Sequence, residues 1–91
     1  SGVDLSGLDL AGFDLERANF RDSNLRNADL GKANLKGANL QNARLQEADL
    51  SKADLYRADL SGADLTDADL EDAVIDAAEL SGAVGAKLPE E

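Results

Sequence analysis

A large apolar residue recurs at every fifth position from Leu5 to Leu80, sixteen times without interruption. Fourteen of these residues are leucine, and Phe20 and Ile75 are the two exceptions. Most are preceded by a small residue and then by Asp or Asn, as in residues 28–30, which read Ala-Asp-Leu. A period this regular constrains the fold more than any other property of the chain.

A five-residue period fits neither an α-helix nor a flat strand. On a helix, five residues advance the side chain by a net rotation of about 140°, which would spread the leucines around the cylinder. In a strand the side-chain period is two, so an odd spacing alternates between faces. A chain that turns by a fixed angle every five residues gives every leucine the same environment. The period therefore predicts a solenoid with a narrow continuous core, and a triangular coil and a four-sided one both satisfy it.

The tandem motif A-(D/N)-L-X-X over residues 3–82 is similar to that of the pentapeptide-repeat family. The resemblance implies an all-β fold, a right-handed quadrilateral parallel β-helix of about four coils with four repeats in each. It also implies that the central residue and the small residue two positions earlier point inward, and that the other three point outward. We expect one repeat domain over residues 1–82 and a terminating tail over residues 83–91.

Both ends of the array depart from the motif. Val3, Leu8 and Phe13 stand where a small inward residue is expected, and we predict that they plug the first coil. At the other end Gly85 takes a core position, and Leu88 is out of register and is expected to fold over the last coil. The alternative for the first coil is sequence drift, because terminal repeats are commonly atypical.

The composition argues against an enzyme. The chain has no Cys and no His, which removes thiolate chemistry and the commonest general base and zinc ligand. Carboxylates on an exposed convex rod stay ionised at neutral pH, whereas a general acid needs a pocket that raises its pKa. We therefore predict no catalysis, no metal and no cofactor.

No apolar run approaches transmembrane length and no signal peptide is visible, so we expect a soluble protein without membrane contact. A bacterial cytoplasm is favoured, and the thylakoid lumen or the periplasm stays open. The oligomeric state is expected to be a monomer or an end-to-end dimer.

The formal net charge of −10 is distributed unevenly. Residues 1–16 carry four acidic groups and no basic one, residues 17–57 carry eight basic against five acidic, and residues 58–91 carry ten acidic against one basic. The sign of the total opposes direct binding of nucleic-acid phosphates. The rod is therefore predicted to have a mixed waist and a strongly acidic C-terminal end.

Outward side chains at twenty-residue spacing should stack into columns, and two features of these columns are candidate functional sites. A Tyr next to an Arg has the composition of a binding hot spot, although a solvated surface pair is the plainer interpretation. The candidate interaction surface comprises Tyr56, Arg57, Lys36, Arg17, Asp69, Glu71 and Asp72.

The second feature is a column of aspartates, Asp9, Asp29, Asp49 and Asp69. It could be a cation-binding or phosphate-mimicking ladder, but the favoured interpretation is that each side chain bonds the backbone at its corner, as Asp and Asn do in turns.

Two functional hypotheses follow. The leading one is a non-catalytic structural or protein-interaction module, because outward residues of a solenoid vary without disturbing the core. Its protein partner is unknown. The alternative is DNA mimicry of the kind known in family members that bind type II topoisomerases such as gyrase, which share the rod shape and acidity. This chain departs from those members in its short length, its lack of loops and its net basic waist.

Overall fold

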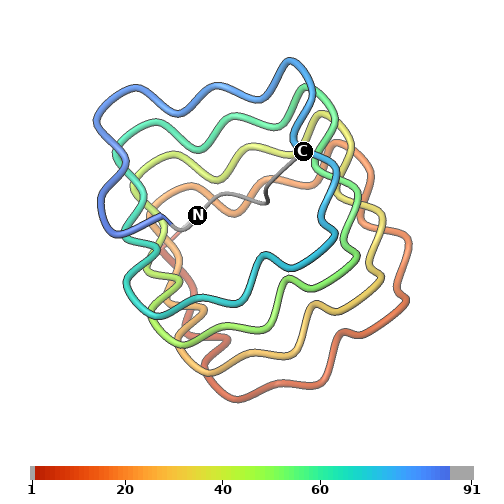
Figure 1. Cartoon of the computed structure of the whole chain (residues 1–91). Helices are drawn as coiled ribbons and strands as arrows, with labels where there is room; N and C mark the ends of the chain where they lie inside the picture. Colours follow the sequence, from red (N-terminus) through yellow and green to blue (C-terminus); the bar gives the residue numbers. More distant parts are fainter. Residues whose placement is uncertain (1, 87–91) are drawn as a thin grey trace.

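A computed structural model of the chain describes residues 2–86, which wind into four stacked four-sided coils (Figure 1). Parallel β-bridges join residues twenty apart, from Asp4 and Asn24 to Asp64 and Val84, so each coil holds four repeats. Within residues 2–86 there is no helix and no strand longer than a single bridge residue, and no helix that could cross a membrane. The fold is the predicted right-handed quadrilateral parallel β-helix.

In a repeat that follows the motif every peptide N–H has a defined partner, as the repeat Ala28–Lys32 shows. The N–H of Ala28 closes a turn within the coil at 3.1 Å, and that of Asp29 donates to the preceding coil at 2.9 Å. The N–H groups of Leu30 and Lys32 donate to the following coil at 2.7 and 2.9 Å. The remaining N–H, of Gly31, donates to Oδ1 of Asp29 at 3.0 Å. Because buried or edge N–H groups are costly when unpaired, this scheme explains why one side-chain acceptor is needed in each repeat.

The corner itself requires a left-handed residue. The last position of each repeat has a positive φ, near 60° in eleven non-glycine residues such as Asn27 and Asn42. A positive φ at the third residue of a four-residue turn is the signature of a type II turn, for which Gly and Asn are best suited. Each corner thus consists of two residues: the last residue of the repeat, which must adopt a positive φ, and the residue before it, which can vary freely.

The Asp or Asn before the central residue caps nearly every corner in the structure. Its Oδ1 accepts the N–H two residues further on, and the capping residues are Asp4, Asp9, Asp14, Asn19, Asn24, Asp29, Asn34, Asn39, Asp49, Asp54, Asp59, Asp64 and Asp69. Arg44 and Val74 occupy the same position and have no such oxygen. The recurrent Asp or Asn of the motif is therefore a backbone cap.

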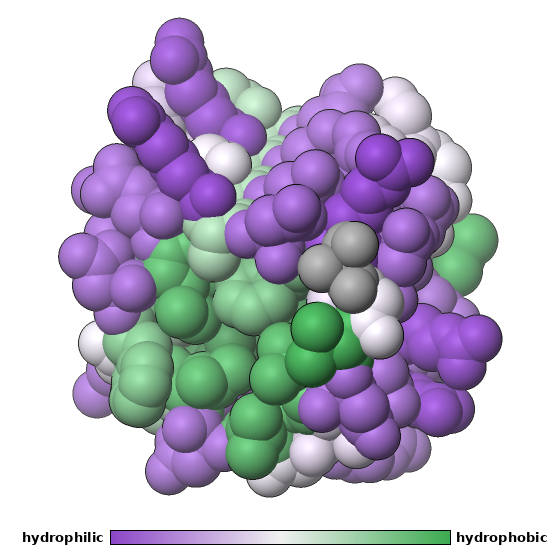
Figure 2. Space-filling view, turned by 180° about the vertical axis from the view of Figure 1, so that it is seen from behind, coloured by the Kyte–Doolittle hydropathy of each residue, from purple (hydrophilic) through white to green (hydrophobic). Residues whose placement is uncertain are grey.

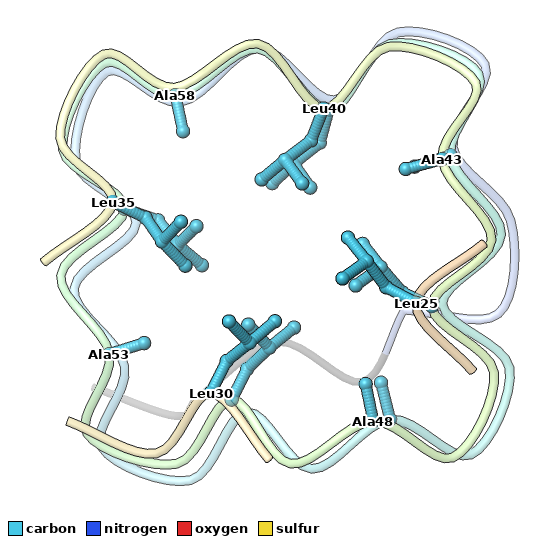
Figure 3. Close-up of a cluster of buried hydrophobic side chains, with 14 of the residues drawn as sticks. Leu25, Leu30, Leu35, Leu40, Ala43, Ala48, Ala53 and Ala58 are labelled. Atoms are coloured by element: carbon cyan, nitrogen blue, oxygen red, sulfur yellow. The ribbon is translucent and has the colours of Figure 1, made fainter. Parts of the chain in front are cut away.

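The core is a column of leucines with alanines between them. Leu25, Leu30, Leu35 and Leu40 point inward from the four sides of one coil, and alanines line the walls between the leucines (Figure 3). All central residues from Leu25 to Leu65 are at most 1% exposed. Burying a leucine contributes roughly 1.5–3 kcal/mol, and an interior this narrow leaves room only for a small residue beside each one.

The first coil is not plugged, so that prediction is wrong. Val3, Leu8 and Phe13 are 49%, 46% and 53% exposed, and the central residues of the same coil remain partly exposed. Figure 2 shows the result, an apolar patch on the N-terminal end of the rod within a hydrophilic rim. The physical reason is that the first coil pairs only with the second, so its inward side chains have no coil on their other side to cover them.

At the C-terminal end the bridge between Asp64 and Val84 begins a fifth coil, and the five-residue pattern then stops. A side chain at Gly85 would lie 2.7–2.8 Å from the backbone of Thr66, and its φ is +72°. The close approach requires glycine here. The predicted position of Leu88 over the last coil falls outside the described residues.

The corner carboxylates Asp4, Asp59 and Asp64 have lowered pKa values, and for Asp4 the main cause is the hydrogen bond from the backbone N–H of Ser6. A hydrogen bond from the Ser61 hydroxyl, at 2.6 Å, is the main cause for Asp59, and the Thr66 hydroxyl at 2.6 Å plays the same role for Asp64. Gln41 of the preceding coil also donates to Asp59, so one carboxylate ties a corner to its neighbour. Because these hydrogen bonds are made to the ionised carboxylate, they stabilise the charged form and lower its pKa.

We expect Val74→Asn to stabilise the rod. Asn supplies the missing cap for the N–H of Asp76, which has no hydrogen-bond acceptor among the described residues. One such bond is worth about 0.5–1.5 kcal/mol. Chemical denaturation measures the gain, with Val74→Leu as a control of similar shape that lacks the oxygen. An equal gain in both variants would contradict the capping role.

Acidification should destabilise the rod through the corner aspartates. Because the pKa of Asp59 is lower in the folded state, its contribution to the free energy of unfolding is present above the unfolded value of about 4 and disappears as the pH falls through the folded value. Ser61→Ala should raise the folded pKa of Asp59 towards its ordinary value and reduce its contribution to this pH dependence. Carboxyl NMR titration and denaturation at pH 6 and 3 test this, with Ser81→Ala, whose hydroxyl bonds Glu79, as the matched control.

Candidate interaction groove

One corner of the rod carries an open groove built from three successive coils. Its lining consists of the two outward residues that follow the central residue in each coil, Glu16, Arg17, Lys36, Gly37, Tyr56 and Arg57. The groove has a volume of about 460 Å³. We call this set the corner groove.

The backbone of the corner groove is fixed by the caps and the inter-coil ladder. Oδ1 of Asp14, Asn34 and Asp54 each accept the N–H of the first groove residue in their coil, at 3.1–3.3 Å. The N–H groups of Arg17, Gly37 and Arg57 donate to the next coil at 2.8–3.1 Å. All six backbone N–H groups along the groove are therefore used, and only side chains can donate hydrogen bonds to a ligand.

Gly37 forms a notch between two arginines. Arg17 lies one coil before it and Arg57 one coil after it, so the two α-carbons are about 10 Å apart, twice the strand spacing. A Cβ at Gly37 would lie 3.4 Å from Cγ of Arg17, which shows that the arginine stem leans over the glycine. A larger residue at position 37 would therefore press against the stem of Arg17.

Tyr56 and Lys36 have partners within the groove region. The Arg57 guanidinium lies 5.6 Å from the centre of the Tyr56 ring, within the range of a cation–π contact. Nζ of Lys36 lies 3.5 Å from Oδ2 of Asp54, a half-exposed ion pair that contributes little stability. Tyr56 remains 42% exposed, so its ring is still accessible to a partner.

The groove gathers three cations, Arg17, Lys36 and Arg57, against a single acidic lining residue, Glu16. The next residue in the same column, Asp76, belongs to the acidic fourth coil. On a chain of net charge −10 this is a local reversal of sign. The lining as a whole therefore carries an excess of positive charge.

The structure brings four of the predicted surface residues together, namely Arg17, Lys36, Tyr56 and Arg57. The predicted surface did not include Gly37. The sequence indicates its place, because Gly37 lies twenty residues from both Arg17 and Arg57 and has no side chain. The three acidic members of the predicted surface lie elsewhere. Asp69 caps the N–H of Glu71 at 3.0 Å, and Glu71 and Asp72 are exposed at a different corner.

The column of Asp9, Asp29, Asp49 and Asp69 serves the backbone. Each carboxylate accepts the N–H two residues on, at 2.9–3.1 Å. Within residues 2–86 no group of three or more acidic side chains is arranged to hold a metal ion. The interpretation as corner caps is thus confirmed for all four.

The five-residue repeats also relate this chain to known proteins. The family model described as "Pentapeptide repeats" matches residues 1–37, 33–72 and 53–84, with eight copies. The chain belongs to the pentapeptide-repeat family. No curated protein matches the sequence.

Solved structures of other pentapeptide-repeat proteins have the same fold. The protein Rfr23 from the cyanobacterium Cyanothece 51142 is 28% identical with a TM-score of 0.89, over 99% of this chain and 58% of its own. The protein alr5209 from Nostoc PCC 7120 is 40% identical with a TM-score of 0.90, over 97% and 75%. A protein from the Arabidopsis thaliana thylakoid lumen is 37% identical with a TM-score of 0.73, over 100% and 70%. The chain thus spans little more than half the length of the first of these relatives.

Proposed function

We propose that this pentapeptide-repeat protein is a non-catalytic module that binds a protein partner, and that the corner groove is its binding surface. The observation that carries the proposal is the gathering of Arg17, Arg57 and Tyr56 on one corner of a rigid scaffold. Tyr and Arg are the residue types enriched where interfaces derive most of their affinity.

The scaffold supports this role in two ways. The core residues Leu25 to Leu65 are fully buried, so the outward residues vary without disturbing the fold. The inter-coil hydrogen bonds hold the corner backbone in place before a partner arrives, which lowers the entropic cost of binding.

The charge arrangement favours this proposal over DNA mimicry. A mimic of the DNA backbone needs an uninterrupted negative surface, whereas three cations lie together in the corner groove. A gyrase supercoiling assay with and without a quinolone separates the two hypotheses, because the groove proposal expects neither inhibition nor protection.

The proposal predicts that reversing the groove charges abolishes partner binding. Arg17→Glu with Arg57→Glu should weaken binding by about tenfold or more, since removing a hot-spot arginine costs about 2 kcal/mol. Affinity capture from an extract of the source organism, followed by measurement of the affinity for the identified partner, provides the test.

The matched control is Lys32→Glu with Lys52→Glu, which changes the net charge equally at a different corner. Equal losses in both double variants would contradict a role for the groove and indicate a general charge effect. An unchanged affinity in the groove variant would place the binding surface elsewhere.

A further inference from the structure

We infer that the corner groove binds a short acidic segment of its partner, with carboxylates held by Arg17 and Arg57 on either side of Gly37. The inference rests on the proposed function and adds the chemical class of the ligand. It follows from three properties of the groove: the spacing of its cations, the state of its backbone N–H groups and the charges at its two ends.

The spacing of the arginines suits two carboxylates on one extended segment. The two arginines are two rungs apart, about 10 Å, and carboxylates two residues apart on an extended segment lie on one face at about 7 Å, a difference that the long Arg side chains can cover. A guanidinium offers a planar pair of N–H donors that matches a carboxylate. Gly37 adds no side chain between the two arginines, so a bound segment meets only the stem of Arg17 above the glycine.

The backbone N–H groups of the groove are already hydrogen-bonded within the fold, which favours a carboxylate ligand over a phosphate. Phosphate sites in proteins commonly use free backbone N–H groups that converge on the oxygens. In the corner groove the N–H groups of Arg17, Gly37 and Arg57 are all bonded to the next coil. Glu16 in the lining also repels a phosphate dianion more strongly than a singly charged carboxylate.

The charges beyond the groove limit the length of the anion. Glu16 lies at the N-terminal end of the groove, and Asp76 follows Tyr56 in the next coil. A long polyanion such as a nucleic acid would extend past both of them into the acidic first and last coils. A segment of a few residues contacts the cations alone, and its remaining side chains can pack on the exposed ring of Tyr56.

A labelled hexaglutamate peptide is the direct probe, with fluorescence anisotropy as the readout and hexaglutamine as the uncharged comparison. The protein should bind hexaglutamate, and the affinity should fall as salt is raised. Arg17→Glu with Arg57→Glu should weaken binding by about tenfold or more, whereas Lys32→Glu with Lys52→Glu, with the same net charge, should change it by less than about twofold. Arg17→Lys with Arg57→Lys should lie between the two, because the charge is kept and the planar donor pair is lost.

Gly37→Asn tests the notch separately. Asn already occupies the same left-handed corner position at Asn27 and Asn42, with φ of 61° and 58°, so the variant should fold normally by chemical denaturation. It should nevertheless weaken hexaglutamate binding about fivefold, because its side chain enters the space between the arginines.

Several outcomes would overturn the inference. Equal binding of hexaglutamate by the groove and control variants would show a general charge effect, and tighter groove-dependent binding of tripolyphosphate would identify a phosphate site. Self-association in sedimentation that Arg17→Glu with Arg57→Glu abolishes would make a second copy the occupant. If wild-type protein ignores hexaglutamate but the groove variant still loses the natural partner, the ligand class is wrong and the proposed function stands.

Discussion

The hydrogen bonding of the peptide groups is the constraint on which the rest of this structure depends. A coil that turns every five residues leaves one N–H in each repeat without a backbone acceptor, that of the residue after the central leucine. The side chain of Asp or Asn provides the acceptor, as between Asp29 and Gly31. This single requirement accounts for the most polar part of the motif, and it explains why a column of aspartates on the rod is structural.

The same constraint determines where the chain is free to vary. The inward pair is set by packing and the Asp or Asn by capping, so only the last two positions of each repeat remain. The second of these must adopt a positive φ, and Arg17, Gly37 and Arg57 all have one. Any recognition surface must therefore be assembled at the corners, from residues that stack one coil apart. The corner groove is the place where these residues combine charge with an aromatic ring.

Much of this could be predicted from the sequence, and the failures have identifiable physical causes. The leucine period predicted the solenoid and its core, and the family resemblance supplied the four-sided coil that places Arg17, Lys36 and Tyr56 in register. The predicted plug of Val3, Leu8 and Phe13 failed because residue size alone does not say whether a side chain in a terminal coil is covered. Gly37 was missed because its contribution is an absence between two side chains, visible only when the columns are placed in three dimensions. Asp69, Glu71 and Asp72 were grouped by charge, which does not report the corner at which a residue lies.

Net charge is a poor guide to the partner of such a rod, because recognition here acts over short distances. At physiological ionic strength the Debye length is about 8 Å, close to the two rungs of about 10 Å that separate Arg17 from Arg57. A small anion in the groove therefore interacts chiefly with the nearest cations, and those carboxylates of the last coil that lie further away than this length are largely screened from it. A longer anion must lie along the rod, so it comes close to the carboxylates of the first and last coils and is repelled by them. The groove that we propose would in this way let a protein of net charge −10 accept an acidic segment and still reject nucleic acid.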